Sequence, residues 1–321
     1  MKHWNHIPHP EQNIEGFTNV ALPSEAIKQQ LTELSKTVSF PPLADSVLTL
    51  RRSLSIAPLA SAAIQAGLSV RKDQKQLNSG EQKAFKDAVT KLVTDGTYAQ
   101  LVSVHADMSH NMHGSMGPTG MLRFLGWHRR YILEFERKLV AADQQLRPGA
   151  ADSPALPFWH WPDPFPIWLN DFLPARRPDT NTTPSKRKDK PPPPKPSQAD
   201  VNDILTGFGA QLPSDPVNDY VRFTYGLEGW GKRSDGSPLP AHNQVHDWVG
   251  GIMSNTMYSP TDPVFWLHHG EVDRLWHVWQ ISNPNVDPPL MGNEAIMDPW
   301  TETYADIRAI EALGYTYGAA P

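Results

Sequence analysis

The 321-residue sequence contains no cysteine. This absence excludes disulfide bonds, thiolate metal sites, cysteine nucleophiles and iron–sulfur clusters, and it leaves histidine as the strongest ligand for soft or borderline metals. Long apolar runs are missing too: no stretch approaches the ~18 residues that a membrane-spanning helix needs, and the N-terminal residues lack the apolar core of a secretory signal. We therefore expect a soluble protein, cytoplasmic or exported, without a membrane partner.

A large excess of charge of one sign is also absent. The net charge is −5, and no basic stretch is interleaved with aromatic residues, so nothing favours nucleic acid as a partner. Alternating strand patterns of useful length are missing. With 39% hydrophobic residues and 11 Trp, the chain can still bury a large core. These features predict a mainly α-helical domain with long loops and little strand.

Helical periodicity begins after residue 68. Residues 79–96 predict an amphipathic helix that stops at Gly96, and residues 97–106 predict a second helix that carries His105. A third predicted helix starts near Phe124.

Two proline-rich regions mark the organisation of the chain. We expect residues 1–68, where prolines interrupt one helical stretch, to form an extension packed on a domain of residues 69–321. Residues 176–200 are rich in proline and lysine and predict an exposed, polyproline-like surface loop. Its charges indicate solvated surface, with docking of a partner as the alternative.

Histidines are concentrated in two segments. In the later one, His242 and His246 are four residues apart and would be neighbours on one helix face, so a third imidazole must come from outside that helix. A single pair with this spacing is expected by chance in roughly half of chains with so many histidines, and is weak by itself. The earlier segment, HADMSHNMHGSMGPTGMLRFLGWHRR, supplies a second histidine cluster. Two clusters indicate two metal ions.

Several longer motifs resemble those of the type-3 copper proteins, the family of tyrosinases, catechol oxidases and haemocyanins. FLGWHRRYILEFE resembles the first copper motif, and HNQVHDWVGGIM with DPVFWLHHGEVDRLWHVWQ resembles the second. The segments LPFWHWPDP and LGYTYG match as well, so that the resemblance covers roughly residues 69–318. It implies a four-helix bundle that holds two copper ions, with O2 as co-substrate.

The lack of cysteine places the chain nearer to the bacterial members of that family. Many fungal, plant and molluscan relatives link a cysteine to a copper-binding histidine, and this chain has no cysteine. The sequence ends four residues after Tyr317, where many relatives continue into a domain that covers the active site. We therefore expect that this lid domain is absent.

By this resemblance, His242, His246 and His269 would bind the second copper. Adjacent helical residues diverge by about 100°, so only one histidine of the His268–His269 doublet can face the ion, and the family pattern selects His269. His268 is then expected to be a packed neighbour. Asp273, four residues beyond His269, is expected to orient that imidazole or its helix.

For the first copper, His105 and His128 match the family pattern, but the middle ligand is displaced. Most relatives have it nine residues before the third histidine, where this chain has Thr119. A local insertion must have shifted it. We choose His113 over His110 because His113 is nearer to His128 and leads into the glycine-rich approach to it.

The resemblance implies an oxidoreductase that hydroxylates monophenols at the ortho position and oxidises o-diphenols to o-quinones. Zinc would fit the nitrogen ligands but cannot change oxidation state, and dizinc hydrolases normally recruit bridging carboxylates.

A phenol has a pKa near 10 and needs help to lose its proton. Asn243 resembles the residue that relatives use with a glutamate to hold a proton-accepting water. Glu228 is our candidate partner, with a surface carboxylate as the alternative.

Two other functions stay open at this point. A catechol oxidase without monophenolase activity would differ only in access and proton handling, and a haemocyanin-like O2 carrier would bind O2 without turnover. The expected partners are a small phenolic or catecholic substrate and a copper-delivery protein.

Overall fold

The computed structural model describes residues 68–150, 154–187, 194–206, 219–233 and 235–318. The predicted N-terminal extension therefore lies outside the described residues, apart from residue 68. The described part is mainly helical, and its strands are β1 (Ser69–Arg71) and β2 (Tyr315–Tyr317), which pair in parallel. The predicted fold class, mainly α with little strand, is confirmed. None of the described helices combines the length and apolarity that a membrane crossing requires.

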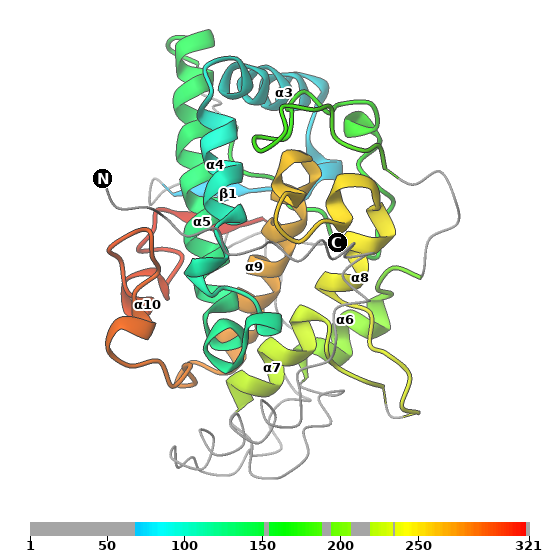
Figure 1. Ribbon diagram of the computed structural model, residues 1–321, viewed down its shortest axis with the longest axis vertical. Coiled ribbons are helices and arrows are strands. Elements are labelled where there is room, and N and C mark those ends of the chain that lie inside the picture. The colour runs from blue at the N-terminus through cyan, green and yellow to red at the C-terminus, as the bar shows by residue number, and fades with distance from the viewer. Residues whose placement is uncertain (1–67, 151–153, 188–193, 207–218, 234, 319–321) are drawn as a thin grey trace.

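Two long helices form the centre of the molecule. They are α5 (Pro118–Leu146) and α9 (Val264–Ser282), which pack against each other (Figure 1). The remaining α-helices of the described part are α3 (Ser79–Thr94), α4 (Thr97–Ala106), α6 (Gln198–Leu205), α7 (Asp219–Glu228), α8 (His242–Val249) and α10 (Tyr304–Ile307). Short 3-10 turns connect them: η4 (Gln74–Gln76), η5 (Met108–His110), η6 (Gly114–Met116), η7 (Ile167–Leu169), η8 (Gly251–Ser254), η9 (Ser259–Thr261) and η10 (Gly292–Ala295).

The first two described helices follow the sequence prediction closely. A reciprocal capping box between Asn78 and Glu81 begins α3, and its apolar face is buried. Gly96, at φ 83°, lies between α3 and α4, in a left-handed conformation that glycine adopts without strain. The chain therefore turns sharply and delivers His105 near the end of α4.

The start of α5 differs from the prediction. The helix begins at Pro118, not near Phe124, because Gly117 takes φ 121° and Pro118 occupies the first turn, where its missing N–H costs nothing. From Gly120 to Leu133 every residue of α5 is buried. Such a helix is surrounded by protein, and this position lets it present His128 to the interior.

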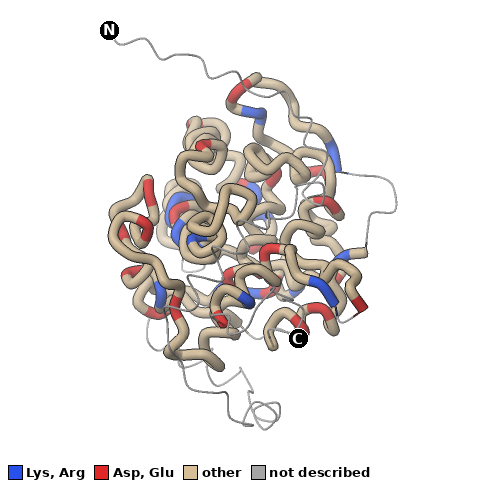
Figure 2. Tube along the Cα trace, turned by 60° about the horizontal axis from the view of Figure 1, so that its bottom comes forward, with Lys and Arg blue, Asp and Glu red and all other residues tan. Residues whose placement is uncertain are grey.

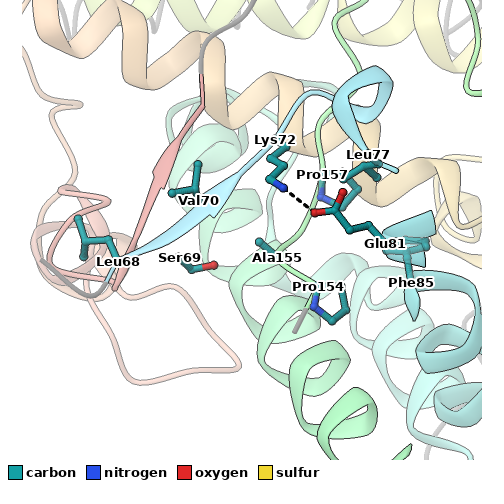
Figure 3. Close-up of a pocket in the computed structure, with 10 residues that line it drawn as sticks. All are labelled: Leu68, Ser69, Val70, Lys72, Leu77, Glu81, Phe85, Pro154, Ala155 and Pro157. Carbon is teal, nitrogen blue, oxygen red and sulfur yellow. Dashed lines mark hydrogen bonds and ion pairs between the residues drawn. The ribbon is translucent and has the colours of Figure 1, made fainter. Parts of the chain in front are cut away.

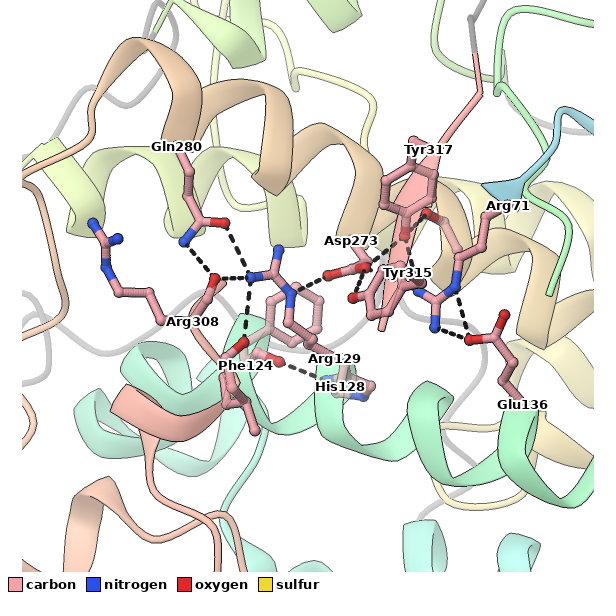
Figure 4. Close-up of polar contacts among 12 residues, drawn as sticks. Arg71, Phe124, His128, Arg129, Glu136, Asp273, Gln280, Arg308, Tyr315 and Tyr317 are labelled. Atoms are coloured by element: carbon pink, nitrogen blue, oxygen red, sulfur yellow. Dashed lines mark hydrogen bonds and ion pairs between the residues drawn. The ribbon is translucent and has the colours of Figure 1, made fainter. Parts of the chain in front are cut away.

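A buried ionic network joins both ends of the described chain to the two central helices (Figure 4). Its members are Arg71 on β1, Arg129 and Glu136 on α5, Asp273 on α9, and Tyr315 and Tyr317 on β2. Asp273 accepts hydrogen bonds from Arg129 Nε at 2.5 Å, Arg71 Nη1 at 3.0 Å and Tyr315 Oη at 2.7 Å. The hydrogen-bond partners of Asp273 do not include His269. Of the two expected roles, orienting the His269 ring or its helix, these contacts support the second: Asp273 fixes α9.

Several contacts hold the described parts of residues 176–200 against the domain. Arg187 forms an ion pair with the buried Asp262 at 2.6 Å, and Lys195 Nζ donates to the main-chain carbonyl of Pro162 at 2.7 Å. Helix α6 begins at Gln198, inside this range. Figure 2 shows acidic and basic positions interspersed along the trace.

A recess of about 260 Å³ opens beside β1 and the start of α3 (Figure 3). Leu68, Val70 and Phe85 are among the residues that line it, and Lys72 pairs with Glu81 across it at 2.5 Å. The residues that line the recess include no histidine. It is therefore separate from the candidate metal centre.

Candidate metal centre

Three histidines distant in sequence meet inside the domain. His105 comes from α4, His113 from the loop before η6, and His128 from α5, and one ring nitrogen of each lies within 4.8 Å of the others. We call them the first trio. Their ring centroids are 5.0 to 5.6 Å apart, and all three side chains are buried.

The hydrogen bonds of the first trio leave one nitrogen of each ring free to bind a metal. His105 Nδ1 lies 3.1 Å from the carbonyl oxygen of Met257, and His128 Nδ1 lies 2.8 Å from that of Phe124. A carbonyl only accepts, so Nδ1 carries the proton and Nε2 carries a lone pair. Nε2 of all three rings, His113 included, is buried without a hydrogen-bond partner. Three converging, unpartnered ring nitrogens fit a metal ion.

A second trio is formed by His242 and His246 on α8 and His269 on α9. The Nε2 atom of His242 lies 3.1 Å from that of His246 and 3.3 Å from that of His269. Nδ1 of His246 donates to the carbonyl of Met253 at 2.8 Å, so its Nε2 also carries a lone pair. The second trio therefore converges on one point in the same way.

His268 lies close to the second trio but is held differently. The indole N–H of Trp161 donates to His268 Nδ1 at 3.0 Å. A neutral ring that accepts at Nδ1 carries its proton on Nε2, and this proton excludes a metal from that nitrogen. Three of the four clustered histidines therefore offer lone pairs, in agreement with the choice of His269 from the doublet.

The two trios form a single centre. His128 and His269 stack with ring centroids 4.5 Å apart and planes at 14°. Phe265 packs on His269 at 4.1 Å and on His105 at 5.2 Å, and so touches both trios. Phe124, on α5, also touches both trios, at 4.8 Å from His128 and 4.9 Å from His242. Two ions in this centre would be neighbours, enclosed by aromatic rings that exclude water.

The electrostatics favour the ligand form of each imidazole. Burial, as the main cause, lowers the pKa of His113 to about 4 and that of His242 to about 3, and it lowers the pKa of the other four well below the ordinary value. The six rings are therefore neutral near pH 7. No carboxylate belongs to either trio. An all-imidazole set suits copper, and neutral ligands leave the charge of both ions available to an oxygen-derived anion.

The structure places His113, not His110, in the first trio. His110 Nδ1 pairs with Asp298 at 2.6 Å, and its ring stacks on Trp127 instead. Thr119 points elsewhere, with its hydroxyl donating to Glu294 at 2.9 Å. Gly120, in the first turn of α5, packs against the loop that carries His113. A Cβ on Gly120 would lie 2.2 Å from the carbonyl oxygen of His113, so glycine is required there.

Glu228 is buried beside the first trio, not on the surface. Its Oε1 accepts from the main-chain N–H of Gly114 at 2.7 Å and lies 3.8 Å from His113 Nδ1, whereas Oε2 makes no hydrogen bond. Burial raises the pKa of Glu228 to about 8, although the hydrogen bond from the Gly114 amide lowers it. Asn243, on α8, contacts His242 Nδ1 through Oδ1 at 2.9 Å.

Sequence reasoning missed the groups that orient the ligands. The carbonyls of Met253 and Met257 hold His246 and His105, and Trp161 sets the tautomer of His268. Main-chain acceptors carry no sequence signature, because every residue has one. The indole in LPFWHWPDP was visible, but nothing in its spacing connects it with the doublet on α9.

Comparison with known proteins identifies the family. The common central domain of tyrosinase matches residues 95–204 and 174–282. The tyrosinase of Streptomyces glaucescens is 32% identical over 273 residues, which span 74% of this chain and 94% of that protein. The chain belongs to the tyrosinase family. As a member it is a type-3 copper oxidase whose cofactors are two copper ions, and its two trios provide a matching pair of sites.

Other proteins resemble this chain in sequence or in fold. The grixazone synthase of Streptomyces griseus is 26% identical and covers 74% of this chain and 95% of that protein. A functional unit of octopus haemocyanin has a TM-score of 0.55 at 23% identity, covering 78% of this chain and 68% of that chain. Active, copper-bound tyrosinase of Aspergillus oryzae, complexed with L-tyrosine, has a TM-score of 0.51 at 16% identity, covering 78% and 93%. At these identities the two structures support the fold alone.

Proposed function

We propose that this enzyme hydroxylates monophenols at the ortho position and oxidises o-diphenols to o-quinones with O2. The observation that carries the proposal is the pair of contacting, all-imidazole trios with a buried carboxylate beside them. Bound copper would supply the redox chemistry, since it can exchange electrons with both O2 and a phenol. The chain's own residues hold the ions, exclude water and handle the substrate's proton.

In this proposal the first trio holds one copper and the second trio holds the other. Four of the six rings have an acceptor for Nδ1: those of His105, His128, His242 and His246. Such contacts fix the tautomer and the direction of a ligand ring before the ion arrives. Phe124 and Phe265 limit the movement of the rings between the two ions.

Glu228 and Asn243 are proposed to assist removal of the phenolic proton. A monophenol has a pKa near 10 and reacts slowly at neutral pH without an acceptor. Glu228 Oε2 is buried and free of hydrogen bonds, and a pKa of about 8 lets the carboxyl take up and release a proton near neutrality. Gly229, at φ 110°, brings the end of α7 against Asn243, which its Cβ would approach to 3.0 Å.

The experiment is copper loading of the metal-free protein followed by assays with L-tyrosine, simple phenols and catechol. We expect two copper ions per chain, oxidation of catechol and, after a lag, hydroxylation of monophenols. Catechol oxidation without any monophenol turnover would establish a catechol oxidase instead. Reversible O2 uptake without turnover would establish a haemocyanin-like carrier.

A copper-delivery protein is proposed as a further partner, because both trios are buried and ions must reach them through the protein. When folded, metal-free protein is exposed to free copper(II), the rate of copper uptake should be lower than the folding rate of the chain. Immediate loading to two ions would contradict this part of the proposal.

A further inference from the structure

His113 differs from the other members of the first trio in what faces its second nitrogen. Main-chain carbonyls orient His105 and His128 through Nδ1. For His113, Glu228 Oε1 lies 3.8 Å from Nδ1. Both side chains are at least 96% buried, so the polar interaction between the ring and the carboxyl group is weakly screened by water.

A glycine fixes the position of this carboxylate. The N–H of Gly114, the residue after His113, donates to Glu228 Oε1 at 2.7 Å. A Cβ at position 114 would lie 2.5 Å from Glu228 Oε2 and 3.0 Å from Trp230 Nε1. Any other residue would push the carboxylate or the loop away. The sequence His113–Gly114 therefore presents both the ring and the amide to one carboxylate.

The main chain of Glu228 reaches the second trio. Glu228 is the last residue of α7, and its carbonyl accepts a hydrogen bond from the His242 ring. Its side chain thus contacts the loop of one trio, and its backbone contacts a ring of the other. A substitution of the side chain removes only the first of these contacts.

We propose that Glu228 is a positioning residue for the first copper: its carboxylate, fixed by the Gly114 amide, holds the His113 ring in place and so sets the affinity of that ion. The inference rests on the ligand assignment of the proposed function. The inference gives Glu228 a second role besides accepting the substrate's proton, because its two carboxyl oxygens have different surroundings. Oε1 is committed to the loop, and Oε2 is available to the substrate's proton.

Competitive titration of the metal-free protein with copper(II) against EDTA tests the proposal. Anomalous diffraction from copper-soaked crystals then gives the occupancy of each site. Glu228→Ala should weaken the first copper by about 10- to 100-fold and leave the second unchanged. Glu228→Gln should restore affinity to within about threefold, because its amide oxygen can still accept from Gly114.

Gly114→Ala should weaken the first copper in the same selective way. Gly226→Ala is the matched control, since a Cβ at this position on α7 meets nothing within 4 Å. It should bind both ions as the parent does. Should Gly114→Ala fail to fold by circular dichroism, the comparison of Glu228→Ala with Glu228→Gln decides alone.

Equal weakening of both ions, or an unchanged first copper in Glu228→Ala, would overturn the positioning role. Normal copper binding with lost monophenol turnover in that variant would also overturn it, while leaving the proposed function intact. A parent protein that binds two copper ions and oxidises no phenol would contradict the proposed function alone.

Discussion

At the scale of single residues, the centre depends on which nitrogen of each ring carries a proton. Carbonyl acceptors place the proton of His105, His128 and His246 on Nδ1, and an indole donor places that of His268 on Nε2. This difference in proton position distinguishes the expected metal ligands from the neighbouring His268. Burial keeps all four of these rings neutral.

The two histidines of the inserted loop provide a matched pair of variants. His113→Ala should reduce the copper content from two ions per chain to about one, because it removes a lone pair from the first trio. His110→Ala should keep both ions, since that ring pairs with Asp298 outside the trio. Copper content by atomic absorption checks both. A His113→Ala protein that keeps two tightly bound ions would refute the assignment.

Asn243→Ala tests the handling of the phenolic proton. We expect monophenol hydroxylation to fall by about 100-fold, in the range of general acid–base contributions, and catechol oxidation to fall far less. Copper content must be measured alongside, because Asn243 also contacts His242. Equal loss of both activities at full copper content would contradict the proposed role.

The buried imidazoles predict the pH dependence of the metal-free protein. The unfolded chain protonates its histidines below pH 6.5, whereas folded His113 and His242 stay neutral down to about pH 4 and 3. Between these limits the unfolded state binds more protons, so stability falls as pH falls, by up to about 1.4 kcal/mol per pH unit for each such ring. Glu228, whose pKa is raised to about 8, acts in the opposite direction: this single group stabilises the folded state as pH falls.

Urea unfolding of metal-free protein at pH 7 and pH 5 measures this effect. The free energy of unfolding should be lower at pH 5, and the difference should shrink when His113 is replaced by Gln. Equal stability at the two pH values would contradict the burial of neutral imidazoles.

At the scale of helices and strands, periodicity predicted α3 and α4 well because their apolar faces and the stop at Gly96 are local features. The start of α5 was misplaced because residues 120–123, in its first turns, are buried on all sides and carry no amphipathic pattern. Strands β1 and β2 have three residues each, too few for alternation to be visible. The pairing depends on residues 246 positions apart, which no local pattern encodes.

The site was predictable to a similar degree. The spacing of His242 and His246 and the doublet on α9 follow from helix geometry, and the structure brings these rings together. His113 required a choice between two histidines in a loop, where spacing gives no direction. The partners of Asp273 could not be predicted, because they come from three separate elements.

Asp273→Asn tests the network that ties these elements together. Burial alone would raise the pKa of Asp273, but Arg129, Arg71 and both tyrosines lower it, so the carboxylate is charged and fully paired. Neutralising it leaves two buried guanidinium groups short of a partner, and should cost about 3–5 kcal/mol in the free energy of unfolding. Chemical denaturation followed by far-ultraviolet circular dichroism measures this.

Asp87→Asn is the control, because its pair with Lys83 is exposed and should contribute at most about 1 kcal/mol. Folded Asp273→Asn protein should still bind two copper ions, since Asp273 hydrogen-bonds no ligand ring. Selective loss of the second copper at unchanged stability would instead support direct orientation of the His269 ring.

At the scale of the whole molecule, two parts of the chain that are far apart in sequence each complete half of one centre. Helices α4 and α5 with the inserted loop supply the first trio, and α8 and α9 supply the second. The packing of α5 against α9 brings the halves into contact, so that His128 stacks on His269. The fold therefore determines the distance between the ions as well as their ligands.

We propose that residues 69–321 form the catalytic domain and that residues 1–68 are an extension packed on it. The described elements begin with β1 at Ser69, and β1 supplies Arg71 to the central network. A chain that starts at residue 68 should fold and bind two copper ions with unchanged affinity. Loss of both ions from a folded, shortened chain would show that the extension belongs to the centre.

Anomalous diffraction at the copper edge from crystals of the copper-loaded protein tests the central claim most directly. We predict two peaks a few ångströms apart, one within bonding distance of Nε2 of His105, His113 and His128, the other of His242, His246 and His269. A single peak, or two peaks bound by other residues, would contradict the account.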